Sequence, residues 1–360
     1  MHSRPHTRRY FSLLAGLLLA ACSSGSVRLP RWDLDGKHIF YVEDRYTFWP
    51  NMEGPDAFRF QLFLSYARLT RALPDRSSAE RVFTGRLHYD SFWQSPNGRH
   101  ILYLEGRGPF RLTVRELASG DELRTLRLDT LELRHPGWRP DSEAFYYTDD
   151  DGDIQVVPID DFWPTERLVV GPAQPRAWSP DGRHLFYTSG PAEYIETNRL
   201  MVLDTKTRET REVLAPANGK IEHVAVAPDG QRVAFAVSLR LGERRDNSLS
   251  IQVAAVDGSS PEEIWHGPAR YVSHIGWTAQ PGELLLDFQP RGYDHVLACL
   301  GPERVLREVT QGPRGFTWSY HLGTRQLMHP DRTTQDFVTR RWTGCDAAHP
   351  EVDLREYRQS

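Results

Sequence analysis

Apolar and polar residues follow one recurring pattern along most of this chain. A short apolar segment ends in tryptophan, a polar turn follows, and a second apolar segment begins at once. The clearest copy reads WSPDGRHLFY over residues 178–187. Proline presets φ at the turn, the aspartate side chain bonds to the backbone that follows, and glycine adopts the positive φ that a reversal needs. The pattern therefore predicts a β-hairpin with little solvent on its apolar face.

Copies of this hairpin recur along the sequence. Aligned on the turn glycine, or on the residue in its place, they centre on Gly36, Gly98, Ser142, Gly182, Gly230, Gly282 and Gly323. Two further β-rich segments follow each hairpin, as at 200–203 and 212–214. Four strands in a repeat of roughly 40 to 60 residues are typical of a propeller blade. We expect an all-β fold, a single β-propeller of four-stranded antiparallel blades, with seven blades favoured and six or eight as alternatives. Residues 351–354 are expected to form the outer strand of the last blade.

The first residues predict export. Arg4, Arg8 and Arg9 precede an apolar run over 11–21, which is too short to span a bilayer and fits a signal peptide. The run ends in LAAC, which resembles the bacterial lipobox and implies that Cys22 is lipidated and becomes the N-terminus. An ordinary signal peptide with an incidental cysteine is the alternative, and the arginine pair also resembles a twin-arginine signal. The expected divisions are 1–21 signal peptide, 22–29 lipidated N-terminus and tether, and 30–360 propeller.

The repeats resemble those of TolB-type propellers of bacterial envelopes, whose blades carry Trp-Ser-Pro-Asp-Gly-Lys turns. The resemblance covers roughly residues 30–345 and implies a protein of the cell envelope. Ser23 directly after the cysteine implies the outer membrane, with the propeller facing the periplasm. Propellers of this type act as protein-binding platforms, sensors, lyases and substrate gates, so the resemblance does not decide the function.

The net charge bears on the class of partner, and the remaining cysteines bear on a possible disulfide. Without residues 1–21 the chain keeps 41 basic and 48 acidic residues, a net charge of −7, which argues against a nucleic-acid partner. Cys299 and Cys345 remain after lipidation. An oxidising envelope permits a disulfide between them, although neighbouring blades lie far apart along most of their faces, and two buried free thiols are the alternative.

Residues with recognisable catalytic or metal-binding spacing are few. The acidic cluster over 149–153 offers the carboxylates that Ca²⁺ prefers, but it lacks the later bidentate acid of a calcium loop and sits where a hairpin turn is expected. No Gly-x-Ser-x-Gly elbow of a hydrolase is present. We therefore expect no cofactor and no metal, and assign no catalytic residue.

The loops that follow the second strand of each blade vary most between repeats, and propeller topology places them on one face. They carry aromatic residues and arginines, the types enriched at binding hot spots. The candidate binding residues are Tyr46, Phe48, Trp49, Tyr194, Arg244, Arg245, Arg291 and Tyr293. Drift of exposed loops is the alternative for any one of them. The sequence favours a non-enzymatic, membrane-anchored platform for a protein or a cell-wall glycan partner; the alternative is an envelope lyase or hydrolase that acts on polysaccharide at the channel mouth.

Overall fold

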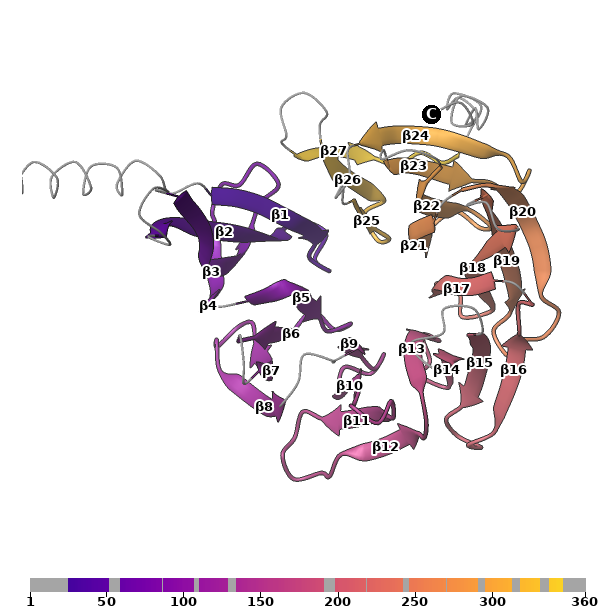
Figure 1. Cartoon of the computed structure of the whole chain (residues 1–360), viewed down its shortest axis with the longest axis horizontal. Coiled ribbons are helices and arrows are strands. Elements are labelled where there is room, and N and C mark those ends of the chain that lie inside the picture. Colours follow the sequence, from indigo (N-terminus) through magenta and orange to yellow (C-terminus); the bar gives the residue numbers. More distant parts are fainter. Residues whose placement is uncertain are drawn as a thin grey trace, which may run out of the picture.

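The chain folds into seven antiparallel sheets arranged around a ring (Figure 1). The computed structural model describes residues 25–51, 59–85, 87–106, 110–128, 134–190, 198–217, 219–241, 246–269, 271–290, 295–312, 318–330 and 337–345. These residues form strands and turns and contain no helix, so none of them forms a helix long and apolar enough to cross a membrane.

Each blade is built from strands that are consecutive in sequence. Blade one holds β1 (Gly25–Trp32), β2 (Ile39–Asn51), β3 (Arg59–Ala72) and β4 (Glu80–Gly85), and blade two holds β5 (Leu87–Gln94), β6 (His100–Glu105), β7 (Phe110–Glu116) and β8 (Glu122–Leu128). Blade three holds β9 (Arg134–Trp138), β10 (Ala144–Thr148), β11 (Ile154–Pro158) and β12 (Glu166–Val169), and blade four holds β13 (Ala173–Trp178), β14 (His184–Ser189), β15 (Arg199–Asp204) and β16 (Thr210–Leu214). Blade five holds β17 (Gly219–Val226), β18 (Arg232–Leu241), β19 (Asp246–Ala255) and β20 (Glu262–Pro268), and blade six holds β21 (Tyr271–Trp277), β22 (Leu284–Gln289), β23 (His295–Leu300) and β24 (Leu306–Gly312). Blade seven holds β25 (Ser319–His321), β26 (Gln326–Pro330) and β27 (Phe337–Arg341).

The expected fold is confirmed. The sheets are antiparallel, the first strand of each blade borders the centre of the ring, and the blades number seven (Figure 1). Six blades have four strands, and the described part of blade seven has three. The strand expected at 351–354 lies outside the described residues, so the fourth strand of this blade stays a prediction.

The Ser-Pro-Asp-Gly turn explains why each hairpin closes where it does. In blade four Ser179 Oγ donates to Asp181 Oδ1 at 2.5 Å and accepts from His184 N at 2.8 Å, while Asp181 also accepts from Arg183 N at 3.0 Å. These hydrogen bonds lower the pKa of Asp181, led by the one from the serine. Gly182 has a φ of 72°, as a glycine at this turn position should. The turn is therefore held by its own side chains.

In two blades a residue other than glycine has the positive φ of the turn. Ser142 takes the glycine position in blade three with a φ of 63°, a conformation that is uncommon for a residue with a Cβ. In blade seven the residue with positive φ is Arg325, at 54°, and not Gly323. The alignment on Gly323 was therefore two residues off, because the loop of blade seven carries the reversal later than the other loops do.

All seven turns lie on one face of the ring, which we call the turn face. Turns of successive blades touch each other: Leu34 N donates to Gln94 Oε1 at 3.3 Å, and Asn97 N donates to Ser142 Oγ at 2.9 Å. The ring closes in the same way, since His321 Nε2 lies 3.1 Å from the carbonyl oxygen of Leu34. The loops after the second strands come off the opposite ends of the strands and define the variable-loop face.

The core consists of seven hydrophobic clusters, one at each junction between neighbouring blades. The junction between blades one and two contains Phe40 and Phe92, and the junction that closes the ring packs Trp32 and Tyr41 of blade one with Met328 of blade seven. No single blade could bury both of its faces, so the ring is the unit of stability.

The repeated tryptophans lie at these junctions, but not equally. Trp138 and Trp277 are 8% and 7% exposed, and their Nε1 atoms donate across the junction to Trp93 O at 2.8 Å and to Ala225 O at 2.9 Å. Trp178 is only half-buried against Tyr146, and its Nε1 makes no hydrogen bond. Trp178 is therefore packed less closely at its junction than Trp138 and Trp277 are at theirs.

Blade one departs from the expected boundaries. β1 begins at Gly25, five residues before the expected start of the propeller at residue 30. The division of the chain into signal peptide, tether and propeller stays a prediction. β2 continues to Asn51, which places Tyr46, Phe48 and Trp49 on a strand and not in a loop. Two prolines in the 43–56 segment favoured a loop, but Pro50 is tolerated in the strand because it lies next to the strand's end.

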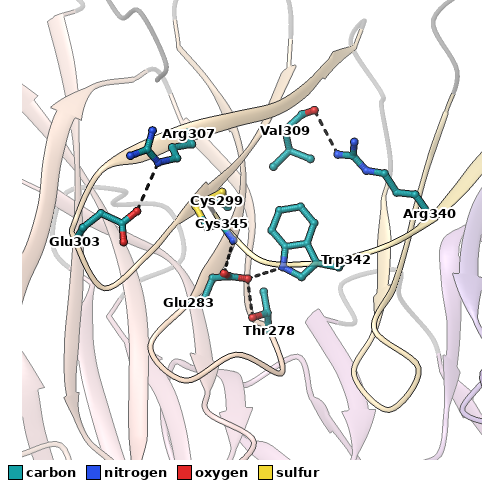
Figure 2. Close-up of a disulfide and its surroundings, with 9 residues drawn as sticks. All are labelled: Thr278, Glu283, Cys299, Glu303, Arg307, Val309, Arg340, Trp342 and Cys345. Carbon is teal, nitrogen blue, oxygen red and sulfur yellow. Dashed lines mark hydrogen bonds and ion pairs between the residues drawn. A yellow bond between two sulfur atoms is a disulfide. The ribbon is translucent and has the colours of Figure 1, made fainter. Parts of the chain in front are cut away.

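A disulfide joins blade six to the end of blade seven (Figure 2). Cys299 on β23 is bonded to Cys345, with Cα atoms 5.6 Å apart. Glu283, which is 4% exposed, lies beside it and accepts from Thr278 Oγ1 at 2.8 Å, Trp342 Nε1 at 2.5 Å and Cys345 N at 2.5 Å. Of the two alternatives that the sequence left open, the structure has the disulfide. The two blades approach closely here because the chain turns back toward blade six after β27.

Candidate functional site

A cavity of about 790 Å³ lies at the centre of the ring. Most of its wall comes from the first strands of blades five, six, seven and one, namely β17, β21, β25 and β1, which border the centre in Figure 1. The second strand of blade six, β22, contributes Leu285 and Asp287. Pro228 and Leu322, which belong to turns, also line it, so the cavity reaches the turn face. Its volume is within the range of small-molecule sites.

His274 on β21 is the central titratable residue of this cavity. Its ring meets the Trp318 ring edge-on with centroids 5.1 Å apart and the His223 ring at 5.9 Å. Desolvation by the surrounding blades lowers its pKa to about 4, and the positive charge of Arg31 adds to the shift. The side chain is nevertheless exposed to the lumen, so lumen water moderates the desolvation. His274 is therefore a neutral imidazole at pH 7, able to donate and to accept one hydrogen bond.

Arg31 on β1 supplies a positive charge to the same cavity. Its guanidinium lies 5.0 Å from the centroid of the Phe92 ring, and Nη1 donates to the Phe92 carbonyl oxygen at 2.9 Å. These contacts fix the guanidinium of Arg31 against blade two, and the Arg31 side chain also lines the cavity. An arginine fixed in this way is suited to a carboxylate ligand.

Asp287 lines the cavity from β22 and pairs with a buried histidine of β23. His295 Nδ1 lies 3.0 Å from Asp287 Oδ1, and burial raises the pKa of Asp287 while His295 opposes the shift. Ser273 Oγ lies 3.4 Å from the same ring nitrogen. A nucleophilic triad needs the serine and the acid on different nitrogens of the imidazole. These three residues therefore tie blade six together and do not form a hydrolase triad.

Aromatic residues complete the described wall. Trp277, Trp318 and Tyr320 line the cavity, and the Tyr320 hydroxyl accepts from Ala279 N at 3.3 Å. Asp287 is the single acid among the described lining residues. The glycosidase mechanism needs two carboxyl groups facing the bond that is cut, and the described wall offers one that is already paired. The wall is better suited to recognition of an anionic, partly apolar ligand.

None of the sequence-derived candidates is among the described residues that line this cavity. Cys22, Tyr194, Arg244, Arg245, Arg291 and Tyr293 lie outside the described residues. Tyr46, Phe48 and Trp49 lie on β2, where the structure describes the strand but not their side chains. The binding role of these eight loop and strand residues stays a prediction.

Two acidic clusters are explained by local bonding. Asp33 and Asp35 come within reach of His38, a grouping that could hold a metal ion, but Arg71 already pairs with both carboxylates, at 2.5 Å and 2.7 Å. In the 149–153 turn Asp149 accepts from the backbone of Asp151 and Asp153, as an ordinary turn does. The expectation of no metal stays a prediction.

Sequence reasoning missed the cavity residues. Arg31, His274 and Trp318 come from three blades and are up to 287 positions apart, so no spacing rule connects them. The signal that existed was a polar residue next to the apolar end of a first strand, as in Arg31-Trp32. Only the closed ring shows that these positions share one lumen.

Comparison with protein-family models and with curated protein sequences finds no match. Solved structures do match. An oligogalacturonate lyase from Vibrio parahaemolyticus is 12% identical with a TM-score of 0.60, covering 88% of this chain and 89% of that one. Hydrazine synthase of Kuenenia stuttgartiensis is 11% identical with a TM-score of 0.57, covering 88% and 95%.

The chain is a seven-bladed β-propeller. TolB from Acinetobacter baumannii is also among the similar structures, at 17% identity and a TM-score of 0.44, covering 66% of this chain. The matched region spans about half, 53%, of that TolB chain. The propeller agrees with the TolB-type resemblance of the repeats. At these identities the likeness shows the fold alone. Proteins with unrelated names share this fold, so function depends on the site and not on the propeller.

Proposed function

We propose that this protein is a lipid-anchored propeller of the cell envelope that binds an anionic cell-wall glycan in its central cavity without changing it chemically. The observation that carries the proposal is the cavity itself, in which Arg31 and the neutral His274 lie among the aromatic rings of Trp318 and Tyr320. Each of these groups has a role in recognition, and none requires a chemical step.

The chemistry of the wall matches a carboxylated sugar. Arginine pairs with a carboxylate through parallel N–H donors, and a neutral imidazole can bond to hydroxyl groups. Flat aromatic rings offer apolar contact to the C–H faces of a sugar ring. Arg31 is the one arginine or lysine among the described residues that line the cavity, and its charge favours an anionic ligand at this place. A protein partner that presents a carboxylate is the other class of ligand for this wall.

Anchoring at Cys22 is the second part of the proposal. Replacing this residue by serine should leave an unprocessed precursor that takes up no labelled palmitate. If the Cys22→Ser protein is still processed and still partitions with membranes, Cys22 is not the lipid anchor.

The binding claim is tested by calorimetry. The mature chain is titrated with soluble disaccharide-peptide fragments of peptidoglycan and with a neutral chitin disaccharide. We expect binding of the carboxylated fragment only, weakened about tenfold or more in Arg31→Gln, because loss of one charged hydrogen bond costs on the order of 1.4 kcal/mol or more.

The matched control is Arg199→Gln. Arg199 lies on the third strand of blade four and pairs with Glu212 at 3.1 Å, away from the cavity. This variant should bind as the wild type does. Equal loss in both arginine variants, or no binding to any carboxylated glycan, would refute the proposed function.

A second function is favoured by one observation, the unprotonated His274 beside Arg31. Polysaccharide lyases remove a proton next to a carboxylate, which needs a base and a cation to neutralise the acid. In such a step a nitrogen of His274 would take the proton, a C=C bond would form, and the glycosidic oxygen would leave with the electron pair. Incubation with polygalacturonate and alginate tests this directly, because the unsaturated product absorbs in the ultraviolet. Absorbance that grows with the wild type and not with His274→Gln would favour the lyase over the binding protein.

A further inference from the structure

The second hairpin of blade one is longer than its blade. β1 pairs with β2 as far as Gly25↔Arg45, and β4 pairs with β3 as far as Ala67↔Gly85. Pairing between β2 and β3 continues for six more pairs, from Tyr46↔Leu64 to Asn51↔Arg59. We call these twelve residues, 46–51 and 59–64, the ribbon. Among the described strands, none pairs with the outer edges of this ribbon. A two-stranded ribbon alone is marginally stable in water, so contact with another surface would stabilise it.

The register makes the ribbon amphipathic. Directly paired residues of antiparallel strands share a face, and faces alternate along each strand. One face therefore holds Tyr46, Phe48, Pro50, Phe60, Leu62 and Leu64, all of them apolar or aromatic. The other face mixes Trp49 and Phe63 with Thr47, Asn51, Arg59 and Gln61. Arg59 is the one charged residue among the twelve.

The first described residue, Gly25, lies at the base of this ribbon, where it pairs with Arg45. β1 begins at Gly25 on the variable-loop face and runs toward the turn face, where Trp32 precedes the first turn. Cys22 is three residues before Gly25, and three extended residues span at most about 11 Å. The ribbon extends six residues past the pairing of Gly25, about 20 Å. A lipid on Cys22 is therefore within the length of the ribbon.

We propose that the apolar face of the ribbon docks on the surface of the lipid bilayer beside the N-terminal anchor. For its position this rests on the proposed lipidation of Cys22. Aromatic and leucine residues with a single charge suit the interface between headgroups and acyl chains. The segment 52–58, which links the two strands in sequence, contains the acids Glu53 and Asp56. Charged groups are costly to bury in hydrocarbon, so the proposal is confined to the apolar face of the ribbon.

This docking orients the whole propeller. The variable-loop face lies toward the membrane, and the turn face, where the central cavity opens, points away from it toward the cell wall. Tyr46 and Phe48, expected from sequence to bind a partner, belong to the membrane contact instead.

The test uses the mature chain with Cys22→Ser, which carries no lipid, and vesicles of phosphatidylethanolamine with phosphatidylglycerol. Sedimentation should show weak binding that falls about tenfold or more in Phe48→Ser/Leu62→Ser, two residues of the apolar face. The matched control is Thr47→Ser/Gln61→Ser on the other face, which should bind as the parent does. Circular dichroism should be unchanged in both pairs, since the ribbon extends beyond the pairing of β2 and β3 with β1 and β4. If the first pair unfolds, Phe60→Ser alone replaces it.

Three outcomes would overturn the proposal. They are no vesicle binding by the parent, equal loss in both pairs, and a dimer in light scattering that only the apolar-face pair dissolves, which would make this face a contact between copies. Because the assay protein has no lipid, its result is independent of palmitate labelling at Cys22. The proposed lipid anchor and the proposed membrane contact of the ribbon are therefore tested independently.

Discussion

Removal of the disulfide between Cys299 and Cys345 should lower the free energy of unfolding by about 4 kcal/mol. The two residues are 46 positions apart, and closing a loop of that length removes about 14 cal/mol/K of entropy from the unfolded chain, which is about 4 kcal/mol at 25 °C. Cys299 is fully buried in a cluster with Leu285 and Leu327, so truncation to alanine adds a small cavity cost.

The assay is equilibrium unfolding in urea of the Cys22→Ser chain, with and without Cys299→Ala/Cys345→Ala. The parent should lose its extra stability when a reductant is present during unfolding, and the variant should not respond to the reductant. Alkylation in denaturant without reductant should label no thiol in the parent. Labelling of two thiols, or the same unfolding midpoint with and without reductant, would show that the bond does not form and that blades six and seven are held by packing alone.

Three further substitutions test the packing and the electrostatics. Trp138→Phe should cost about 1–2 kcal/mol in urea unfolding because Trp93 O loses its donor, and Trp178→Phe, whose Nε1 makes no hydrogen bond, should cost less; equal costs would contradict the bridging role. Glu283→Gln should lower the free energy of unfolding by about 2–4 kcal/mol, because the buried carboxylate accepts three hydrogen bonds and glutamine replaces one of its oxygens by an amide donor. The control Glu303→Gln, at an exposed site, should cost less than about 0.5 kcal/mol in the same unfolding experiment. His274 takes up a proton near pH 6.5 in the unfolded chain and near pH 4 in the folded chain, so it contributes stability above pH 6.5 that is lost as the pH falls toward 4. Urea unfolding at a series of pH values should show that the free energy of unfolding of His274→Gln falls less steeply over this range. The same dependence on pH in wild type and variant would exclude His274 as the cause.

The repeat was visible in the sequence because its cause is local. The serine, aspartate and glycine of each turn bond to one another within a few residues, as Ser179 and Asp181 do, so each copy carries its own signature. Blade number and strand order follow from counting these copies. The one shifted alignment, at Gly323, occurred where the turn lacks the proline and aspartate.

The cavity was not visible because its cause is global. Arg31 and His274 become neighbours only when blades five, six, seven and one close around the lumen. The long strands of blade one were missed for a different reason: the two prolines of the 43–56 segment favoured a loop, although the alternation of residues continues through Trp49. Register, which the sequence did not specify, then separates the apolar face of the ribbon from the mixed one.

The central claim, an anionic glycan held in the central cavity, is tested most directly by a crystal structure of the mature chain with a carboxylated disaccharide-peptide fragment. The account predicts density for the ligand between Arg31 and Trp318, with a carboxylate on the Arg31 guanidinium and a ring hydroxyl within hydrogen-bond distance of His274. Density for the fragment on the variable-loop face, with the cavity free of it at saturating concentration, would contradict the account.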